Sequence, residues 1–329
     1  MAVPPSRLFL GIISWYGLLI VLGMILAVIL SDREAKRISL PPDTVIDLAL
    51  ILLPAGILGA RLYYVIFAWN DFRANPLSVF EIWKGGLAIY GGLLGGFCTV
   101  VWFCRRKGIP LPQMLDILMP GVALAQAIGR WGNYFNQEAY GLLLPEDSPL
   151  CFFPLAVLIQ EGIRQSWHLA AFFFESCWDF LIFCFLLWGR RKLFRKQGDV
   201  FLWYLLLYGA GRQVIESLRM DSLYLGEQIR VSQLLSILLV LAILLCFIHR
   251  RKKAGSLSGW LALAAVFAGI TGVLLLCSCL PVIPSPFLKA PPARILFLGF
   301  GSLGLIMAAI LLYGGTTSQE VIYACHKAE

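Results

Sequence analysis

Residues 8–30 read LFLGIISWYGLLIVLGMILAVIL and contain no charged side chain. An apolar stretch of this length crosses a hydrocarbon core roughly 30 Å thick as an α-helix. Of the 329 residues, 59% are hydrophobic and only 14% are charged, which excludes a soluble globular domain. Because similar stretches recur, the sequence predicts an all-α, polytopic transmembrane helical bundle with about nine spans. The predicted spans are 8–30, 44–68, 86–103, 113–130, 169–188, 199–218, 231–248, 259–280 and 294–313.

The loops between the predicted spans alternate in their content of Arg and Lys. Cytoplasmic loops of membrane proteins carry the excess of these residues, so the basic loops are predicted to face the cytoplasm. The N-terminus then lies outside and the C-terminus inside. The formal net charge of +8 therefore reflects topology and contact with anionic membrane lipids, and no nucleic acid partner is expected. The basic loops carry Arg33, Lys36 and Arg37; Arg105, Arg106 and Lys107; Arg190, Arg191, Lys192, Arg195 and Lys196; and Arg250 to Lys253.

Ionisable side chains inside a bilayer cost several kcal/mol each unless they are paired or hydrated, so they are candidates for function. In the predicted orientation, polar groups from six spans fall in the outer half of the membrane. Arg212, Glu216 and Arg219 share one helical face through their i, i+4 and i+7 spacing. This stripe is either an ion-pair ladder that joins two helices or part of an anion-binding site. The other polar groups of this layer are Tyr16, Arg61, Tyr90, Arg130 and Glu175.

The segment GRWGNYFNQE, residues 129–138, ends the fourth predicted span. The amides of Asn133 and Asn136, with backbone N–H groups beside the glycines, can hold a phosphate and glycerol hydroxyls. Arg130 adds a planar guanidinium group that stays charged. Together with Arg212, this arginine suits an anionic ligand.

Two glycine-rich segments flank and enter the third predicted span, at 85–86 and 91–96. Glycines inside a membrane permit close packing of helices. They also leave room for a lipid tail or headgroup, because they have no side chain. Both interpretations remain open at the level of the sequence.

Several other chemistries lack the residues that they need. The chain has only three histidines and no cluster with metal-ligand spacing, so no metal site is expected. A Ser-His-Asp hydrolase is not predicted, because no G-x-S-x-G segment occurs and no serine is expected beside a histidine in the outer layer. Electrostatic catalysis remains, in which arginines neutralise a departing phosphate and a carboxylate or phenol accepts a proton.

Residues 129–141, GRWGNYFNQEAYG, resemble the signature of the prolipoprotein diacylglyceryl transferases, and the likeness extends over roughly residues 5–252. The resemblance implies transfer of the diacylglyceryl group of phosphatidylglycerol to the lipobox cysteine thiol of a prolipoprotein, with release of glycerol phosphate and without cofactor or metal. It also implies a multi-pass protein of the bacterial cytoplasmic membrane, with its active site towards the outer leaflet. Supporting segments are WYG at 15–17, GARLYY at 59–64, GGLAIYGGLLGG at 85–96 and YGAGRQVIESLRMDSL at 208–223.

Carried over residue by residue, the resemblance implies a phosphate site around two arginines. Arg130 binds the phosphate of phosphatidylglycerol, and Arg212 is the second essential arginine. The remaining substrate-binding residues surround these two: Asn133, Asn136, Glu138 and Gly141 on the side of Arg130, Glu216 and Arg219 on the helical face of Arg212, and Tyr16 and Arg61 lining the cavity.

Tyr90 stands where some members of the family have a histidine, so it is a candidate catalytic residue, and the identity of the proton acceptor stays open at the level of the sequence. A phenol is a weak base at neutral pH unless a cation such as Arg130 or Arg212 lies beside it. The segment before the fifth span also departs from the family, since His168 is followed by Leu169 rather than by proline.

The resemblance does not reach the C-terminal residues. We therefore predict a seven-helix catalytic domain at 1–254 and a C-terminal extension with two further spans at 255–329. The alternative function is a transporter or channel with an anion-binding cavity in the outer half. That alternative predicts broken helices near the midplane and internal repeats, and no repeat is visible in the sequence. Another lipid-modifying enzyme that uses the same anionic lipid would differ only in its acceptor.

Overall fold

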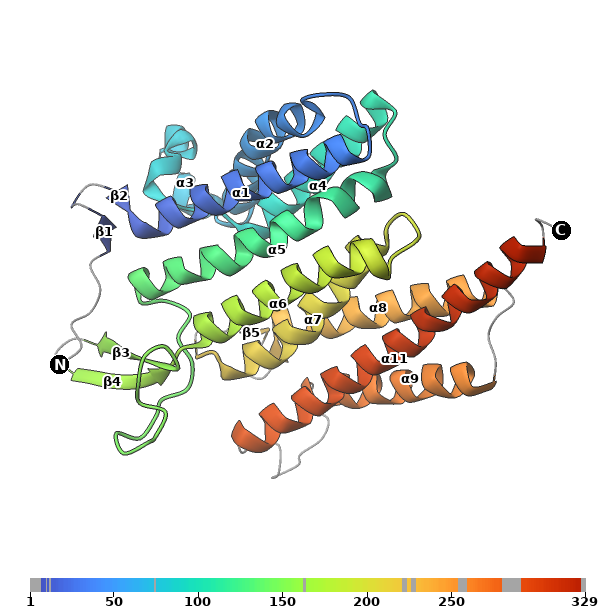
Figure 1. Ribbon diagram of the computed structural model, residues 1–329. Helices are drawn as coiled ribbons and strands as arrows, with labels where there is room; N and C mark the ends of the chain where they lie inside the picture. The colour runs from blue at the N-terminus through green and yellow to red at the C-terminus, as the bar shows by residue number, and fades with distance from the viewer. Residues whose placement is uncertain are drawn as a thin grey trace. The chain divides into compact units, whose positions relative to one another are not determined.

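The computed structural model describes residues 7–9, 11, 13–73, 75–161, 164–220, 224–225, 229–253, 259–279 and 291–326. This described part of the chain is mostly helical (Figure 1). The α-helices are α1 (Trp15–Arg37), α2 (Thr44–Phe67), α3 (Trp69–Phe72), α4 (Ile89–Lys107), α5 (Leu111–Asn136), α6 (Ala171–Lys192), α7 (Asp199–Leu218), α8 (Val231–Lys253), α9 (Gly259–Cys279) and α11 (Pro291–His326). Two 3₁₀ segments, η1 (Pro76–Phe80) and η2 (Ile82–Lys84), lie between α3 and α4.

Each of the nine predicted spans coincides with a helix in the described residues. Six of these helices are long and apolar enough to cross a membrane, which indicates an integral membrane protein. The other three are α4, α7 and α9. Helix α4 ends in the charged residues Arg105–Lys107, and α7 contains the charged residues Arg212 and Glu216. These charges lower the mean hydropathy of the two helices. The six apolar stretches are Trp15–Arg37, Thr44–Phe67, Leu111–Asn136, Ala171–Lys192, Val231–Lys253 and Ile295–Tyr313.

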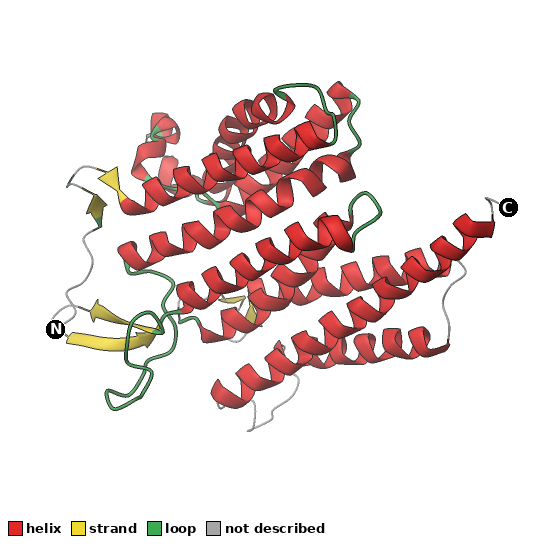
Figure 2. Cartoon of the chain, viewed as in Figure 1, coloured by secondary structure: helices red, strands yellow, loops and turns green. Residues whose placement is uncertain are grey.

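Three short antiparallel hairpins were not predicted (Figure 2). β1 (Leu8–Phe9) pairs with β2 (Ile13–Ser14), so α1 begins at Trp15 and not at residue 8. β3 (Ala156–Glu161) pairs with β4 (Arg164–Leu169) over six residues before α6 begins. The third hairpin joins β5 (Tyr224–Leu225) to β6 (Ile229–Arg230).

Two helices are longer than predicted. α5 continues six residues beyond the predicted end at 130, so the segment 131–136 is helical rather than part of an exit loop. α11 has 36 residues. At 1.5 Å per residue it measures about 54 Å, which exceeds the thickness of the hydrocarbon core.

The chain divides into two compact units. Unit 1 consists of residues 1–23, 123–188 and 202–329, and unit 2 consists of residues 24–122 and 189–201. Unit 1 contains most of α5, α6 and α7, all of α8, α9 and α11, and the β3–β4 hairpin. Beneath this hairpin, Val157, Ile159, Ala170 and Phe172 form a buried core to which Trp131, Tyr134, Tyr140 and Phe173 add their aromatic rings.

In unit 2, glycines bring α2 and α4 into backbone contact. A Cβ atom on Gly91 would lie 2.3 Å from the carbonyl oxygen of Gly59, and one on Gly95 would lie 2.9 Å from that of Ala55. Any side chain at either position would push the two helices apart. At Gly91 and Gly95, close helix packing is therefore the role that the structure supports, out of the two left open by the sequence.

Candidate active site

The side chains of Arg130, Glu175 and Arg212 meet in unit 1, one from each of α5, α6 and α7. Arg130 Nη2 lies 2.7 Å from Glu175 Oε1, and Arg212 Nη1 lies 2.8 Å from the same oxygen. Arg212 Nη2 forms a second ion pair with Glu216 Oε2 at 2.8 Å, as its i, i+4 spacing predicted. Two guanidinium groups from different helices are thus held around one buried carboxylate.

Glu175 is less accessible than the two arginines that it joins. Its side chain is 2% exposed, whereas those of Arg130 and Arg212 are 22% and 16% exposed. In the described residues Arg130 makes no ion pair except with Glu175, and that pair uses one of its five N–H donors. The guanidinium group of Arg130 therefore has donors left for a second anion.

Hydrogen bonds beside the cluster fix the register of the three helices. The hydroxyl of Ser176 donates to the carbonyl of Ala127 at 2.7 Å and accepts from the indole Nε1 of Trp131 at 3.0 Å, which joins α6 to α5. Trp178 Nε1 donates to the carbonyl of Leu207 at 3.0 Å, which joins α6 to α7. A Cβ atom on Gly211 would lie 1.9 Å from Trp178 Nε1, so only glycine fits beneath this indole.

A second polar layer follows on the same three helices. Gln126 precedes Arg130 by four residues, Asp179 follows Glu175 by four, and Tyr208 and Tyr204 precede Arg212 by four and eight. This spacing places each residue on the face that carries the arginine cluster. Tyr204 donates from its hydroxyl to Gln126 Oε1 at 2.8 Å, and the rings of Tyr204 and Tyr208 stack with centroids 5.8 Å apart.

Two carboxylate oxygens in these layers lack a hydrogen bond within the described part of the chain. They are Glu175 Oε2 and Asp179 Oδ2, and both side chains are almost fully buried. The charges of Arg130 and Arg212 act on Asp179, so it belongs to the same electrostatic cluster. A buried carboxylate oxygen without a partner is costly unless a ligand, water or proton supplies the missing bond.

Sequence reasoning did not assign site roles to Glu175, Asp179, Gln126 or Tyr208. The signal that finds them is their i, i+4 spacing within apolar helices, which is the criterion that selected Arg212 and Glu216. Glu175 was noted only as a polar residue entering its span.

The predicted segment after Arg130 lies at the C-terminal end of α5. Asn133 and Asn136 are half-buried, and the chain then turns through Gln137 and Ala139, which have φ values of 56° and 55°. The N–H of Glu138 donates to the carbonyl of Asn133 at 2.9 Å, while the Glu138 side chain is exposed. This turn directs the chain from α5 towards Gly141.

Gly141 is wedged between two backbones. Its N–H donates to the carbonyl of Leu169 at 2.7 Å, and it forms an isolated antiparallel bridge with Arg219, which lies just beyond the end of α7. A Cβ atom at this position would lie 3.0 Å from the carbonyl oxygens of both Leu169 and Leu218. The structure therefore gives Gly141 and Arg219 the task of joining the hairpin to α7.

A contact between His168 and a serine departs from the expectation that no serine lies beside a histidine. In β4, His168 Nε2 lies 3.0 Å from the hydroxyl of Ser166, and Nδ1 lies 3.0 Å from the carbonyl oxygen of Gly141. A carbonyl only accepts, so Nδ1 carries the proton and Nε2 accepts from Ser166. The prediction failed because residues 164–169 form a strand, on which positions i and i+2 share a face. His168 is buried and supports the Gly141 turn.

Tyr16 lies at the start of α1 and packs against α5. A Cβ atom on Gly132 would lie 2.5 Å from Tyr16 Cδ2, so the ring occupies the space that a side chain at 132 would need. Tyr16 thereby contacts the turn of α5 that follows Arg130.

The other two predicted residues, Arg61 and Tyr90, belong to unit 2. Arg61 is buried and donates to four carbonyl oxygens at 2.8–3.0 Å, those of Ser78, Val79, Gly85 and Gly86. It therefore clamps the segment that connects α2 to α4. Tyr90 is 42% exposed in the first turn of α4, and its ring lies 6.5 Å from that of Tyr63.

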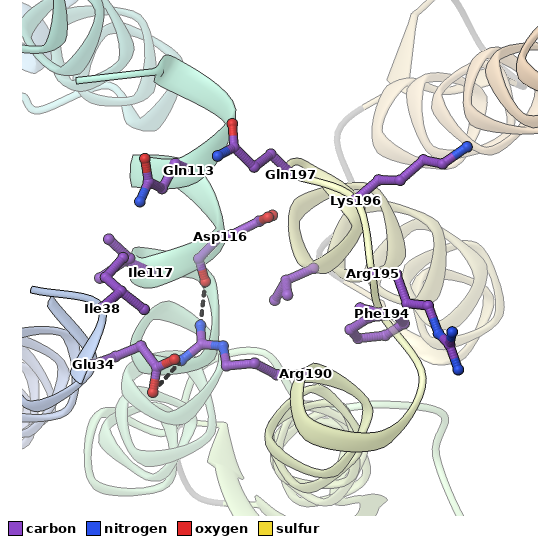
Figure 3. Close-up of a pocket in the computed structure, with 11 residues that line it drawn as sticks. Glu34, Ile38, Gln113, Asp116, Ile117, Arg190, Phe194, Arg195, Lys196 and Gln197 are labelled. Carbon is purple, nitrogen blue, oxygen red and sulfur yellow. Dashed lines mark hydrogen bonds and ion pairs between the residues drawn. The ribbon is translucent and has the colours of Figure 1, made fainter. Parts of the chain in front are cut away.

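A cavity of about 220 Å³ lies elsewhere in unit 2 (Figure 3). Arg190 pairs with Glu34 at 3.4 Å and donates to the carbonyl of Asp116. The carboxylate of Asp116 accepts the N–H groups of Gly198 and Phe201 at 2.6 and 2.9 Å. These contacts tie the α6–α7 connection to α5, and we assign them a structural role.

Residues 7–249 match the sequence profile of the family described as prolipoprotein diacylglyceryl transferase. The chain belongs to this family. Relatives named phosphatidylglycerol–prolipoprotein diacylglyceryl transferase include a protein of Enterococcus faecalis, 47% identical over 249 residues, which cover 75% of this chain and 90% of the relative. A Streptococcus suis relative is 45% identical over 246 residues (74% and 90%), and one from Halalkalibacterium halodurans is 39% identical over 267 residues (77% and 89%).

The prolipoprotein diacylglyceryl transferase match contains the whole arginine cluster and every predicted site residue. It ends within α8. Helices α9 and α11 therefore lie outside the part that this chain shares with the diacylglyceryl transferase profile.

Proposed function

We propose that the chain transfers the diacylglyceryl group of phosphatidylglycerol to the lipobox cysteine of a prolipoprotein. The observation that carries this proposal is the meeting of two guanidinium groups, from Arg130 and Arg212, at one oxygen of Glu175 in a member of the transferase family. Paired arginines suit the phosphodiester of this lipid, because each presents a planar fork of donors to phosphate oxygens.

In the proposed reaction, the cysteine sulfur attacks the glycerol carbon that bears the phosphodiester. A C–S bond forms, the C–O bond to phosphate breaks, and its electron pair leaves with the phosphate oxygen as glycerol phosphate. Arg130 and Arg212 stabilise the negative charge that develops on this oxygen. The thiol proton passes to a base, for which Tyr90 is the proposed group, and the unpartnered oxygens of Glu175 and Asp179 provide a second proposal.

The remaining predicted residues keep proposed roles in substrate binding. The side of the proposed binding pocket next to Arg130 is formed by Asn133, Asn136, Glu138 and Gly141, and Tyr16 lies behind them. Glu216 orients Arg212 through their ion pair, and Arg219 fixes the end of α7. For Arg61 the clamp on carbonyl oxygens supports an indirect role, in which it shapes the segment before α4.

We further propose nine spans, an outer N-terminus, an inner C-terminus and a site towards the outer leaflet of the bacterial cytoplasmic membrane. Adjacent spans then run in opposite directions. The cluster supports this arrangement, because Arg130 and Arg212 lie late in α5 and α7 whereas Glu175 lies early in α6. Residues 1–254 form the proposed catalytic domain and 255–329 the extension.

The transporter or channel alternative is not favoured. A conduction path would need hydrated charges near the midplane. Here the charges of the arginine cluster are paired with one another and lie towards one end of α5, α6 and α7.

The function is tested by incubating the purified full chain with phosphatidylglycerol and a lipobox peptide. Mass spectrometry is expected to show one diacylglyceryl unit added to the cysteine, with an equal amount of glycerol phosphate released. A peptide with serine in place of the cysteine is the matched control, because it keeps the recognition sequence and loses the thiol. Absence of product with the cysteine peptide would contradict the proposal.

The proposed topology is tested with a membrane-impermeant thiol reagent on intact cells. Asp147→Cys and Gln197→Cys place exposed thiols on the two sides, in a variant without other reactive cysteines. Labelling is expected at position 147 only, because 197 lies in a basic loop assigned to the cytoplasm. Equal labelling of both positions would overturn the orientation.

A further inference from the structure

Helix α11 contacts the arginine-bearing helix α7 through a buried polar cluster. The amide of Gln213 in α7 donates to the hydroxyl of Ser302. The single proton of this hydroxyl faces two carbonyl oxygens, that of Ala210 in α7 at 3.0 Å and that of Leu298 in α11 at 2.8 Å. From α8, Gln233 Nε2 donates to the carbonyl of Gln213 at 2.8 Å. Gln213 and Gln233 are fully buried and Ser302 is 5% exposed. These contacts enclose the backbone of α7 on both sides of Arg212.

The turn of α7 that receives these contacts has a low intrinsic helix propensity. α7 carries glycines at 209 and 211, and each glycine is about 1 kcal/mol less favourable than alanine inside a helix. Neither glycine can be replaced freely. A Cβ atom on Gly209 would lie 2.9 Å from a methyl group of Val240, and Gly211 lies under Trp178. Close packing thus requires two glycines of low helix propensity immediately before Arg212.

A second anchor holds α11 at the opposite end of its contact with α7 and α8. The guanidinium group of Arg251 donates to the carbonyl oxygens of Leu311 and Leu312. The ring of Tyr313 lies 5.7 Å from that of Trp203, near the start of α7. α11 therefore runs antiparallel to α7, with Ser302 beside Arg212 and Arg251 distant from it, and Figure 1 shows the two helices within one group with α8 and α9.

From these contacts we infer that the C-terminal extension supports the active site, with Ser302 as a positioning residue that holds the Gly209–Gly211 turn and so fixes Arg212. This inference rests on the proposed function. It assigns a task to helices that lie beyond the family match, which ends at residue 249.

The test compares Ser302→Ala with Ser302→Thr in the full chain. Loss of one hydroxyl contact is expected to lower kcat/KM for phosphatidylglycerol about fivefold in the alanine variant, with most of the loss in kcat. Threonine keeps the hydroxyl and is expected to stay within about twofold of the wild type. Ser302→Cys, which keeps the size of serine, replaces the alanine variant if that protein does not accumulate.

Arg251→Gln is the matched control, because it loosens the same helix at the anchor away from Arg212. It is expected to lower the thermal unfolding temperature and to leave kcat/KM of the folded enzyme unchanged. Wild-type kcat/KM in Ser302→Ala, or an equal loss in Arg251→Gln, would overturn the inference. A wild-type chain that forms no product would instead overturn the proposed function on which the inference rests.

Discussion

Replacing Arg212 with alanine is expected to lower diacylglyceryl transfer at least about 10²-fold to 10³-fold. The substitution removes one of the two cations proposed to stabilise the departing phosphate. It also leaves Glu216 without its 2.8 Å ion pair, and Glu175 with Arg130 alone. The measurement is kcat/KM for phosphatidylglycerol with a lipobox peptide. Arg130→Ala is expected to show a loss of the same order.

Substitution of Arg212 or Arg130 by lysine separates the contribution of the positive charge from that of the planar guanidinium group. An ammonium group keeps the charge and cannot present two parallel donors to a phosphate. Arg212→Lys and Arg130→Lys are therefore expected to fall between alanine and the wild type. Arg105→Ala changes an exposed arginine at the end of α4 and is expected to retain full activity. Full activity in Arg130→Ala or Arg212→Ala would contradict the site.

Glu175→Ala is expected to destabilise the protein by about 3–5 kcal/mol, because it leaves the partly buried guanidinium group of Arg130 without its ion pair and Arg212 with Glu216 alone. The free energy of unfolding in detergent measures this effect. Glu175→Gln keeps the shape and removes the charge, so it is expected to lose stability as well. Glu138→Ala is the matched control, since Glu138 is exposed and surface changes of this kind stay within about 0.5 kcal/mol.

A double substitution tests whether the loss comes from the ion pair. If Arg130→Ala is combined with Glu175→Ala, the loss in the free energy of unfolding of the double variant is expected to be smaller than the sum of the two single losses. The reason is that each single substitution already removes the same ion pair. Strict additivity, or a change below about 1 kcal/mol in Glu175→Ala, would show that the carboxylate does not hold the two arginines together.

The helices were predictable because each depends on a local property of the chain. Long apolar runs located nine of the ten described α-helices, all except the four-residue α3, and local spacing placed Arg212 and Glu216 on one helical face. The β3–β4 hairpin was missed because it lies between predicted spans, in a segment without a clear hydrophobic period, and the β1–β2 hairpin was missed because its apolar residues were included in the predicted span 8–30. Residues 164–169 were consequently not recognised as a strand, and the contact between Ser166 and His168 was excluded.

The centre of the site depends on contacts between helices, which no local pattern contains. Glu175 contacts Arg130, which is 45 positions earlier in the chain, and Arg212, which is 37 positions later. The spacing of residues on one helix carries no information about such contacts between helices. Arg61 illustrates the same limit. The family resemblance implied that it lines the cavity, and no local pattern indicated that its hydrogen-bond partners are carbonyl groups 17 to 25 residues later in the chain.

The indole of Trp178 over Gly211 constrains how this protein can evolve. With 1.9 Å between Trp178 Nε1 and a Cβ atom at 211, a methyl group can enter only after the tryptophan has become smaller. Positions 178 and 211 are therefore expected to covary among homologues, with alanine or serine at 211 accompanied by a small residue at 178. The two substitutions must also arise in that order, since the reverse order passes through a clashing intermediate.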